Sequence, residues 1–106
     1  MSAAVNLDAV FARLETGLMS MLTGGEEAQT LHLVAVERLC ALARTSLAGD
    51  NLAESALSGI AERAPLIAGL MMVPDGLREV ALSECIRLLA QLRDRLAAQR
   101  RVREVA

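Results

Sequence analysis

The sequence has almost none of the side chains from which active sites are built. Its 106 residues include no Trp, Tyr or Lys, one Phe and one His. Leu and Ala supply 19 residues each, and most charged side chains are Arg or Glu. Catalysis needs positioned acids, bases, nucleophiles or metal ligands, whereas this composition supplies helix faces. It predicts a binding module without enzyme activity, cofactor or small-molecule substrate.

Cysteine and long apolar runs are also scarce. Cys40 and Cys85 are far apart and lie within apolar helical patterns, where a reduced thiol behaves as a small hydrophobe. The longest strongly apolar run, residues 66–73, is far shorter than the roughly 20 residues that span a bilayer. Neither secretion nor membrane insertion is indicated, and we expect a reduced, cytoplasmic protein.

The apolar residues recur at helical spacing, and nothing in the chain alternates as a strand would. Turn signals divide the chain into four helical segments, which we expect over residues 7–22, 26–48, 52–72 and 76–103. The third contains Pro65, which removes an amide donor and predicts a kink or a break. We therefore predict a single all-α domain over residues 1–106, an antiparallel bundle of three long helices and one kinked helix.

Polar residues mark where these helices begin. Asn6 is placed to cap the first helix. Thr23 stands three residues before Glu26, the spacing of a capping box for the second helix. The pair at residues 50–51 offers a cap for the third helix, after a stop at Gly49.

The second and fourth helices carry more apolar surface than one neighbour can cover. In the second, Leu31 and Leu42 lie on one apolar line, beside a further line of apolar residues. A helix with so wide an apolar stripe packs against two neighbouring helices, or against one neighbouring helix and a partner outside this chain. The fourth helix has more apolar positions than its core face needs, and these could form a docking surface. The methionines of the 65–73 run are flexible and polarisable, so they suit a protein core and a binding surface equally. The residues that we select are Leu82, Ile86, Leu89, Leu96, Met71 and Met72.

His32 is the single histidine of the chain, but its surroundings match no catalytic or metal-binding pattern. Carboxylate-bridged metal sites in bundles need Glu three residues before His on two helices, and Gln29 occupies that position here. Histidine phosphotransfer needs a cation and a small residue after the His, where this chain has Leu33 and further apolar residues. Cys40 lies about 12 Å along the helix, too far for a nucleophile and base pair. We expect an ordinary or interfacial histidine.

Charge is distributed unevenly along the chain. Residues 1–92 carry −5, and residues 93–106 carry +3 from five arginines and two acids. Such a basic segment could bind nucleic acid, but cationic side chains near the C-terminus of a helix also stabilise it by interacting with the helix dipole. The segment has no aromatic residue for stacking, and its arginines form only a partial patch. Nucleic-acid binding is accordingly the third interpretation, after protein binding and self-association.

Several short features resemble a known family. These are residues 39–44 (Leu-Cys-Ala-Leu-Ala-Arg), the Leu-Ala-Gly-Asp turn at 47–50, and the segment 52–70, with Glu62-Arg63 before Leu66-Ile67. This sequence pattern resembles that of the FlgN-like group, which are small flagellar export chaperones of bacteria that escort hook–filament junction proteins. The resemblance implies a cytoplasmic chaperone that holds an amphipathic helix of an export substrate. The alternative is a structural homodimer whose surplus stripes are buried between two copies.

Overall fold

The computed structural model describes residues 6–70, 72–74 and 76–105, and it confirms the all-α fold. Within these ranges the chain forms four helices and no strand. They are α1 (Leu7–Thr23), α2 (Glu26–Ser46), α3 (Asn51–Ile67) and α4 (Leu77–Val105).

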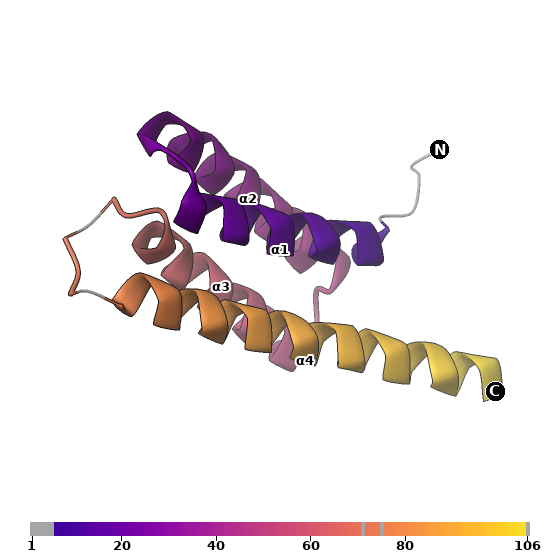
Figure 1. Cartoon of the computed structure of the whole chain (residues 1–106). Helices are drawn as coiled ribbons and strands as arrows, with labels where there is room; N and C mark the ends of the chain where they lie inside the picture. Colours follow the sequence, from indigo (N-terminus) through magenta and orange to yellow (C-terminus); the bar gives the residue numbers. More distant parts are fainter. Residues whose placement is uncertain (1–5, 71, 75, 106) are drawn as a thin grey trace.

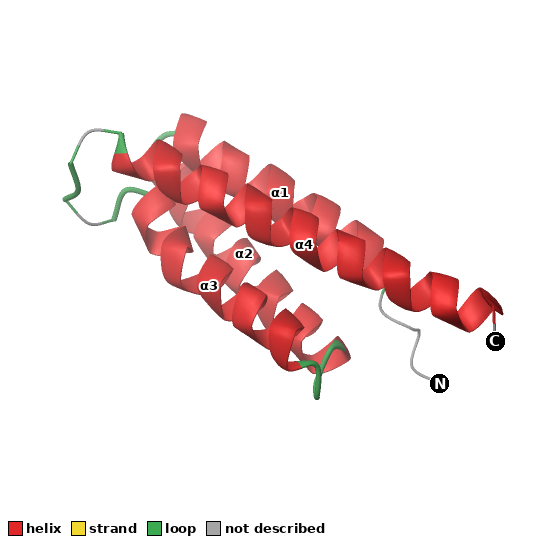
Figure 2. Ribbon diagram, turned by 90° about the horizontal axis from the view of Figure 1, so that it is seen from below, coloured by secondary structure: helices red, strands yellow, loops and turns green. Residues whose placement is uncertain are grey.

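The helices form an antiparallel bundle in which each helix packs mainly against two neighbours, and α1 and α3 also touch across the centre (Figures 1 and 2). The pairs α1–α2, α2–α3 and α3–α4 follow the chain, and α1 packs against α4 to close the ring. With 29 residues, α4 is about 43 Å long. Because α1 and α4 are antiparallel, the C-terminal part of α4 lies at the same end of the bundle as the beginning of α1, and its last turns extend past that helix (Figure 1).

The core is built almost entirely from Leu, Ala, Val, Ile, Met and the two Cys, around the single aromatic side chain, Phe11. None of the described polar or charged residues is buried. Three buried residues of α3 are alanines, Ala53, Ala56 and Ala64, and α4 adds Ala81. The largest fully buried side chains are Phe11, Leu14, Leu18, Met21, Leu57, Ile60, Ile67 and Leu89.

The caps of α1 and α3 are as predicted, and the cap of α2 is not. The Asn6 side chain accepts from the Ala9 amide, and the Asp50 side chain accepts from the Ala53 amide, both at 3.2 Å. The prediction for Thr23 was wrong, because α2 begins after Gly25 with no side-chain cap. Thr23 belongs to the last turn of α1, and its hydroxyl donates back along that helix.

Pro65 lies in the last turn of α3, which ends two residues later at Ile67. The expectation of a helix reaching residue 72 was therefore wrong at its C-terminal end. Gly69 has a φ of 76°, a left-handed conformation that favours glycine and ends the helix. The 65–73 run is divided by this ending: Ile67 and Ala68 are buried, and Met72 is fully exposed.

One arginine joins the ends of two helices. Arg78, in the first turn of α4, donates through Nε and Nη2 to the carbonyl oxygen of Ile67, at 3.0 and 2.8 Å. Its Nη2 also donates to the carbonyl oxygen of Met21, at 3.1 Å. Both carbonyls belong to final turns, where helix carbonyls lack partners within the helix. Arg78 thus satisfies the C-terminal ends of α1 and α3 together.

Candidate partner-binding surface

The apolar residues predicted as a docking surface on α4 are mostly used within the bundle. Leu89 is only 1% exposed and belongs to the core, so its selection was wrong. Leu82, Ile86 and Leu96 are partly buried and pack against the core. The physical reason is that α4 lies between α1 and α3, which together cover most of its wide apolar stripe.

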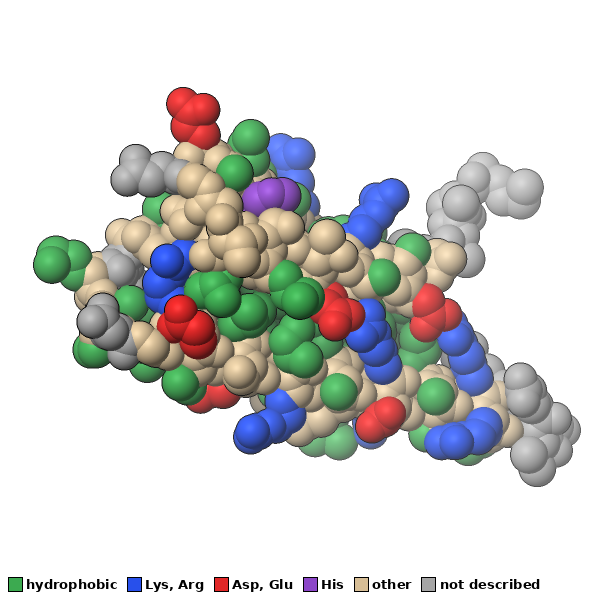
Figure 3. All heavy atoms as spheres, viewed as in Figure 1, with side chains coloured by type: hydrophobic (Ala, Val, Ile, Leu, Met, Phe, Trp, Pro, Cys, Tyr) green, Lys and Arg blue, Asp and Glu red, His purple; other side chains and the backbone are tan. Residues whose placement is uncertain are grey.

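Leu82, Ile86 and Leu96 lie along the seam between α1 and α4. Their spacing places them on the same helix face as Arg93, whose guanidinium pairs with Glu15 of α1 at 3.0 Å. Figure 3 shows hydrophobic side chains filling the space between these two helices. The seam is a packed junction with a partly exposed edge.

Of the two methionines selected in the 65–73 run, the structure describes Met72. Met72 is fully exposed in the connection between α3 and α4, and Leu70 beside it is also exposed. Met71 lies outside the described residues. The connection therefore offers exposed apolar side chains at residues 70 and 72, and both of these residues lie outside the helices.

The most exposed apolar side chain on a helix is Leu31 of α2, and Leu52 of α3 and Val80 and Val102 of α4 are exposed as well. Leu31 is 72% exposed, and Val34 and Leu42 are each 43% exposed. We call these three residues the α2 outer stripe. The opposite face of α2 packs against α1 and α3 through four buried residues, Leu33, Val36, Cys40 and Ala43. Hence α2 has two neighbours and still leaves an apolar line facing solvent.

Beside this stripe, α1 and α2 form a hollow of about 560 Å³ that is open to solvent, which we call the α1–α2 groove. It is lined by Ala12, Arg13, Thr16, Gly17, His32, Ala35, Arg38 and Leu39. The helices approach closely here, because a β-carbon at Gly17 would stand 3.0 Å from the Val36 Cγ2. Small residues form part of its floor, and arginine side chains stand along it. Figure 3 shows histidine and arginine side chains gathered at the upper edge of the α1–α2 layer.

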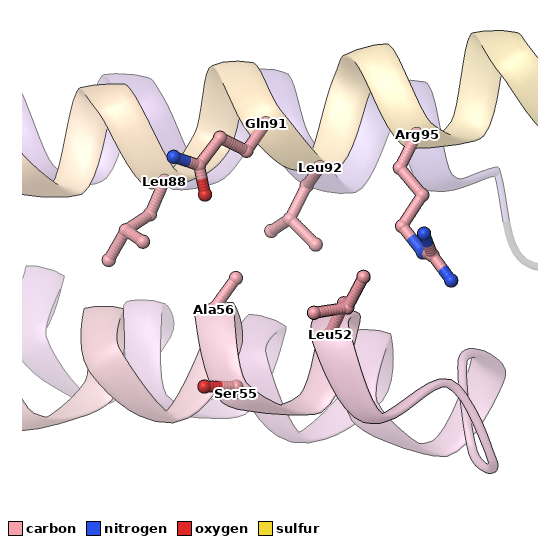
Figure 4. Close-up of a pocket in the computed structure, with 7 residues that line it drawn as sticks. All are labelled: Leu52, Ser55, Ala56, Leu88, Gln91, Leu92 and Arg95. Carbon is pink, nitrogen blue, oxygen red and sulfur yellow. The ribbon is translucent and has the colours of Figure 1, made fainter.

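A smaller hollow of about 310 Å³ lies between α3 and α4 (Figure 4). Leu88 and Leu92 point from α4 toward Ala56 and Leu52 of α3. At one end Arg95 donates to the Asp50 carboxylate at 2.6 Å, and this hydrogen bond is the main cause that holds the pKa of Asp50 below its usual range. The polar side chains of Ser55 and Gln91 also line the hollow, so its lining is mixed.

The arginines at the end of α4 are largely engaged inside the molecule. Arg93 pairs with Glu15 at 3.0 Å, and Arg100 pairs with Asp8 at 2.8 Å. A signal for these pairs was present in the sequence and was missed. The two acids and the two arginines are each seven residues apart, so antiparallel helices bring both pairs into register.

The groups that could carry chemistry are separated or unreactive. Cys40 and Cys85 are buried free thiols, and burial raises the pKa of Cys40 to about 11 and that of Cys85 to about 12. A thiol with so high a pKa is almost entirely protonated near neutral pH and is a poor nucleophile. Among the described residues, no three His, Cys, Asp or Glu side chains are grouped to hold a metal ion.

Comparison with protein-family models, curated proteins and solved structures finds no match for this chain. Over the described ranges, none of the helices combines the length and the hydropathy needed to cross a membrane.

Proposed function

We propose that this chain is a non-enzymatic binding module that holds an amphipathic helix of another protein. The observation that carries the proposal is the α2 outer stripe. Its residues Leu31, Val34 and Leu42 recur at helical spacing, are exposed to solvent and lie beside an open groove. Helix-in-groove recognition uses apolar contacts at such spacing. A stripe of this kind stabilises nothing in the isolated bundle, whereas a docked helix would bury it.

The resemblance of residues 39–70 to flagellar export chaperones suggests the biological setting. Within that setting the chain acts as a bacterial cytoplasmic chaperone or adaptor that shields an apolar helix of an export substrate. Two features support binding to protein over binding to nucleic acid. Arg93, Arg95 and Arg100 are already paired with carboxylates, and the chain has no aromatic residue on α4 for stacking on bases.

The second candidate is a structural homodimer, and the α2 outer stripe favours it as well. In an antiparallel pair of α2 helices, Leu31 of one copy would meet Leu42 of the other, so the stripe is compatible with two-fold symmetry. Light scattering with size-exclusion chromatography over a range of concentrations separates a dimeric module from a monomeric one.

Site-specific photo-crosslinking tests the proposal directly. A photoreactive side chain is placed at Val34, on the stripe, or at Arg87, an exposed position on α4, and is activated in cells that express the protein. We expect a discrete crosslink to a different protein from position 34 and none from position 87. Crosslinks that join only two copies of this chain would favour the homodimer, and equal labelling from both positions would contradict the proposal.

A further inference from the structure

We infer that the α1–α2 groove receives an amphipathic helix that carries carboxylates beside its apolar face, and that this helix belongs to another protein. The inference rests on the proposed function and adds the site and the chemistry of the partner. It is carried by the combination of a floor of small residues with arginines along it that make no ion pair with described residues.

The floor of the groove suits the backbone of a third helix. Ala12 and Gly17 from α1 and Ala35 from α2 present little side-chain volume, so a helix can approach closely over them. Ala35 follows Leu31 by four positions and precedes Leu42 by seven, which places all three on one face of α2. The floor and the α2 outer stripe therefore form one surface about 16 Å long, equal to about three turns of a partner helix. Its apolar residues stand on either side of Arg38.

The cations of the groove have no counter-ion in the described part of the molecule. Arg13 comes from α1 and Arg38 from α2, and neither makes an ion pair there. The acids of α1 are engaged elsewhere, because Asp8 and Glu15 pair with arginines of α4. No carboxylate lines the groove. The groove is thus locally positive on a chain whose net charge is −2.

This charge distribution selects among possible occupants. In a two-fold dimer built on the α2 outer stripe, Arg38 lies near the middle of the face and would approach its counterpart in the second copy. Arg13 would add to the repulsion, and no carboxylate of the groove would offset it. A partner helix with Asp or Glu flanking its apolar residues gives attraction at the same positions. The geometry therefore favours an acidic partner over a second copy.

Synthetic peptides test the inference with a defined probe. Three fluorescent 18-residue peptides share one Leu/Ala apolar face and carry Glu, Gln or Lys on the flanking positions. Their binding is measured by fluorescence anisotropy at low and at moderate salt. We expect the Glu peptide to bind most tightly and to weaken as salt screens the exposed charges. Equal affinity for the Gln or Lys peptide would overturn the assignment of an acidic partner.

Paired variants locate the binding site. Arg13→Gln with Arg38→Gln removes both groove arginines, and Arg87→Gln with Arg101→Gln makes the same charge change at exposed α4 positions. We expect the first pair to weaken binding of the Glu peptide by about 5- to 20-fold, since an exposed charge contact contributes about two- to fivefold, and the second pair to change it less than twofold. All four side chains are exposed and lack ion pairs with described residues, so circular dichroism should report unchanged helix content.

The outcomes separate this inference from the proposed function. If the Glu peptide binds equally to both paired variants, the groove assignment fails while helix binding stands. If no peptide binds and crosslinking from position 34 finds no other protein, both fail. A micromolar dimer that is abolished by Leu31→Glu and excludes the Glu peptide would overturn the inference in favour of a second copy.

Discussion

Removing the Arg78 side chain is expected to loosen the end of the bundle where α1 and α3 terminate. Arg78→Ala deletes three hydrogen bonds from one guanidinium to the carbonyl oxygens of Met21 and Ile67. It also removes a positive charge from the negative ends of two helix dipoles. The guanidinium fits closely here, because a β-carbon at Gly69 would stand 3.3 Å from its Cζ.

The size of the effect follows from these contacts. A hydrogen bond to a charged group contributes about 1.5–3 kcal/mol, and a charge at a helix terminus contributes about 0.3–1 kcal/mol. Arg78 is only partly buried, so water can replace part of each hydrogen bond in the variant. We therefore expect Arg78→Ala to lower the free energy of unfolding by about 2–4 kcal/mol, which corresponds to a decrease in Tm of about 10–20 °C for a domain of this size.

Thermal and urea unfolding followed by circular dichroism measure this loss. Arg78→Lys keeps the charge but cannot reach both carbonyl oxygens with the same fork of donors, so an intermediate loss is expected. Arg87→Ala removes an exposed arginine from the same helix and should cost less than about 0.5 kcal/mol. Equal losses for Arg78→Ala and Arg87→Ala would refute the reasoning.

Two further predictions follow from groups with shifted pKa values. Because burial raises the pKa of the Cys40 and Cys85 thiols to about 11 and about 12, we expect a thiol reagent at pH 8 to label neither in the folded protein and both in urea; rapid labelling without denaturant would contradict this. The pKa of Asp50 is held below 3.8, chiefly by its hydrogen bond with Arg95, so its stabilising effect is present above about pH 4 and is lost as the pH falls further. Asp50→Asn keeps a capping side chain but cannot titrate, so the difference in Tm between wild type and variant should shrink below pH 4; a constant difference from pH 6 to pH 2 would exclude this pair as a source of acid sensitivity.

The helices and two of their caps could be predicted from sequence, because these features depend on local spacing. Asn6 and Asp50 cap helices through backbone amides three residues away, a contact that the sequence contains by itself. The hydroxyl of Thr23 had two local partners available, and it takes the carbonyl within α1. The end of α3 near Pro65 was placed too late, although proline and Gly69 were both visible in the sequence.

The candidate surface was harder to predict, because exposure depends on which neighbours a helix has. Leu89 and Leu31 both stand at helical spacing in wide apolar stripes, yet Leu89 is buried between helices and Leu31 faces solvent. Periodicity identifies the stripe and leaves open which part of it the bundle covers. Arg78 was missed for a related reason, since the carbonyls that it binds lie 11 and 57 residues earlier in the chain.

The contact between α1 and α4 has a consequence for the order in which the bundle assembles. The other neighbouring helices are consecutive in the chain and are joined by connections of two to nine residues, so less chain entropy is lost when they pair. The α1–α4 contact joins the two ends of the sequence, and its ion pairs span 78 residues between Glu15 and Arg93. It carries the largest loop-closure cost of the four. When the native bundle opens locally, separation of α1 from α4 gives the largest gain in conformational entropy of the chain. Separation at this seam would expose Leu82, Ile86 and Leu96.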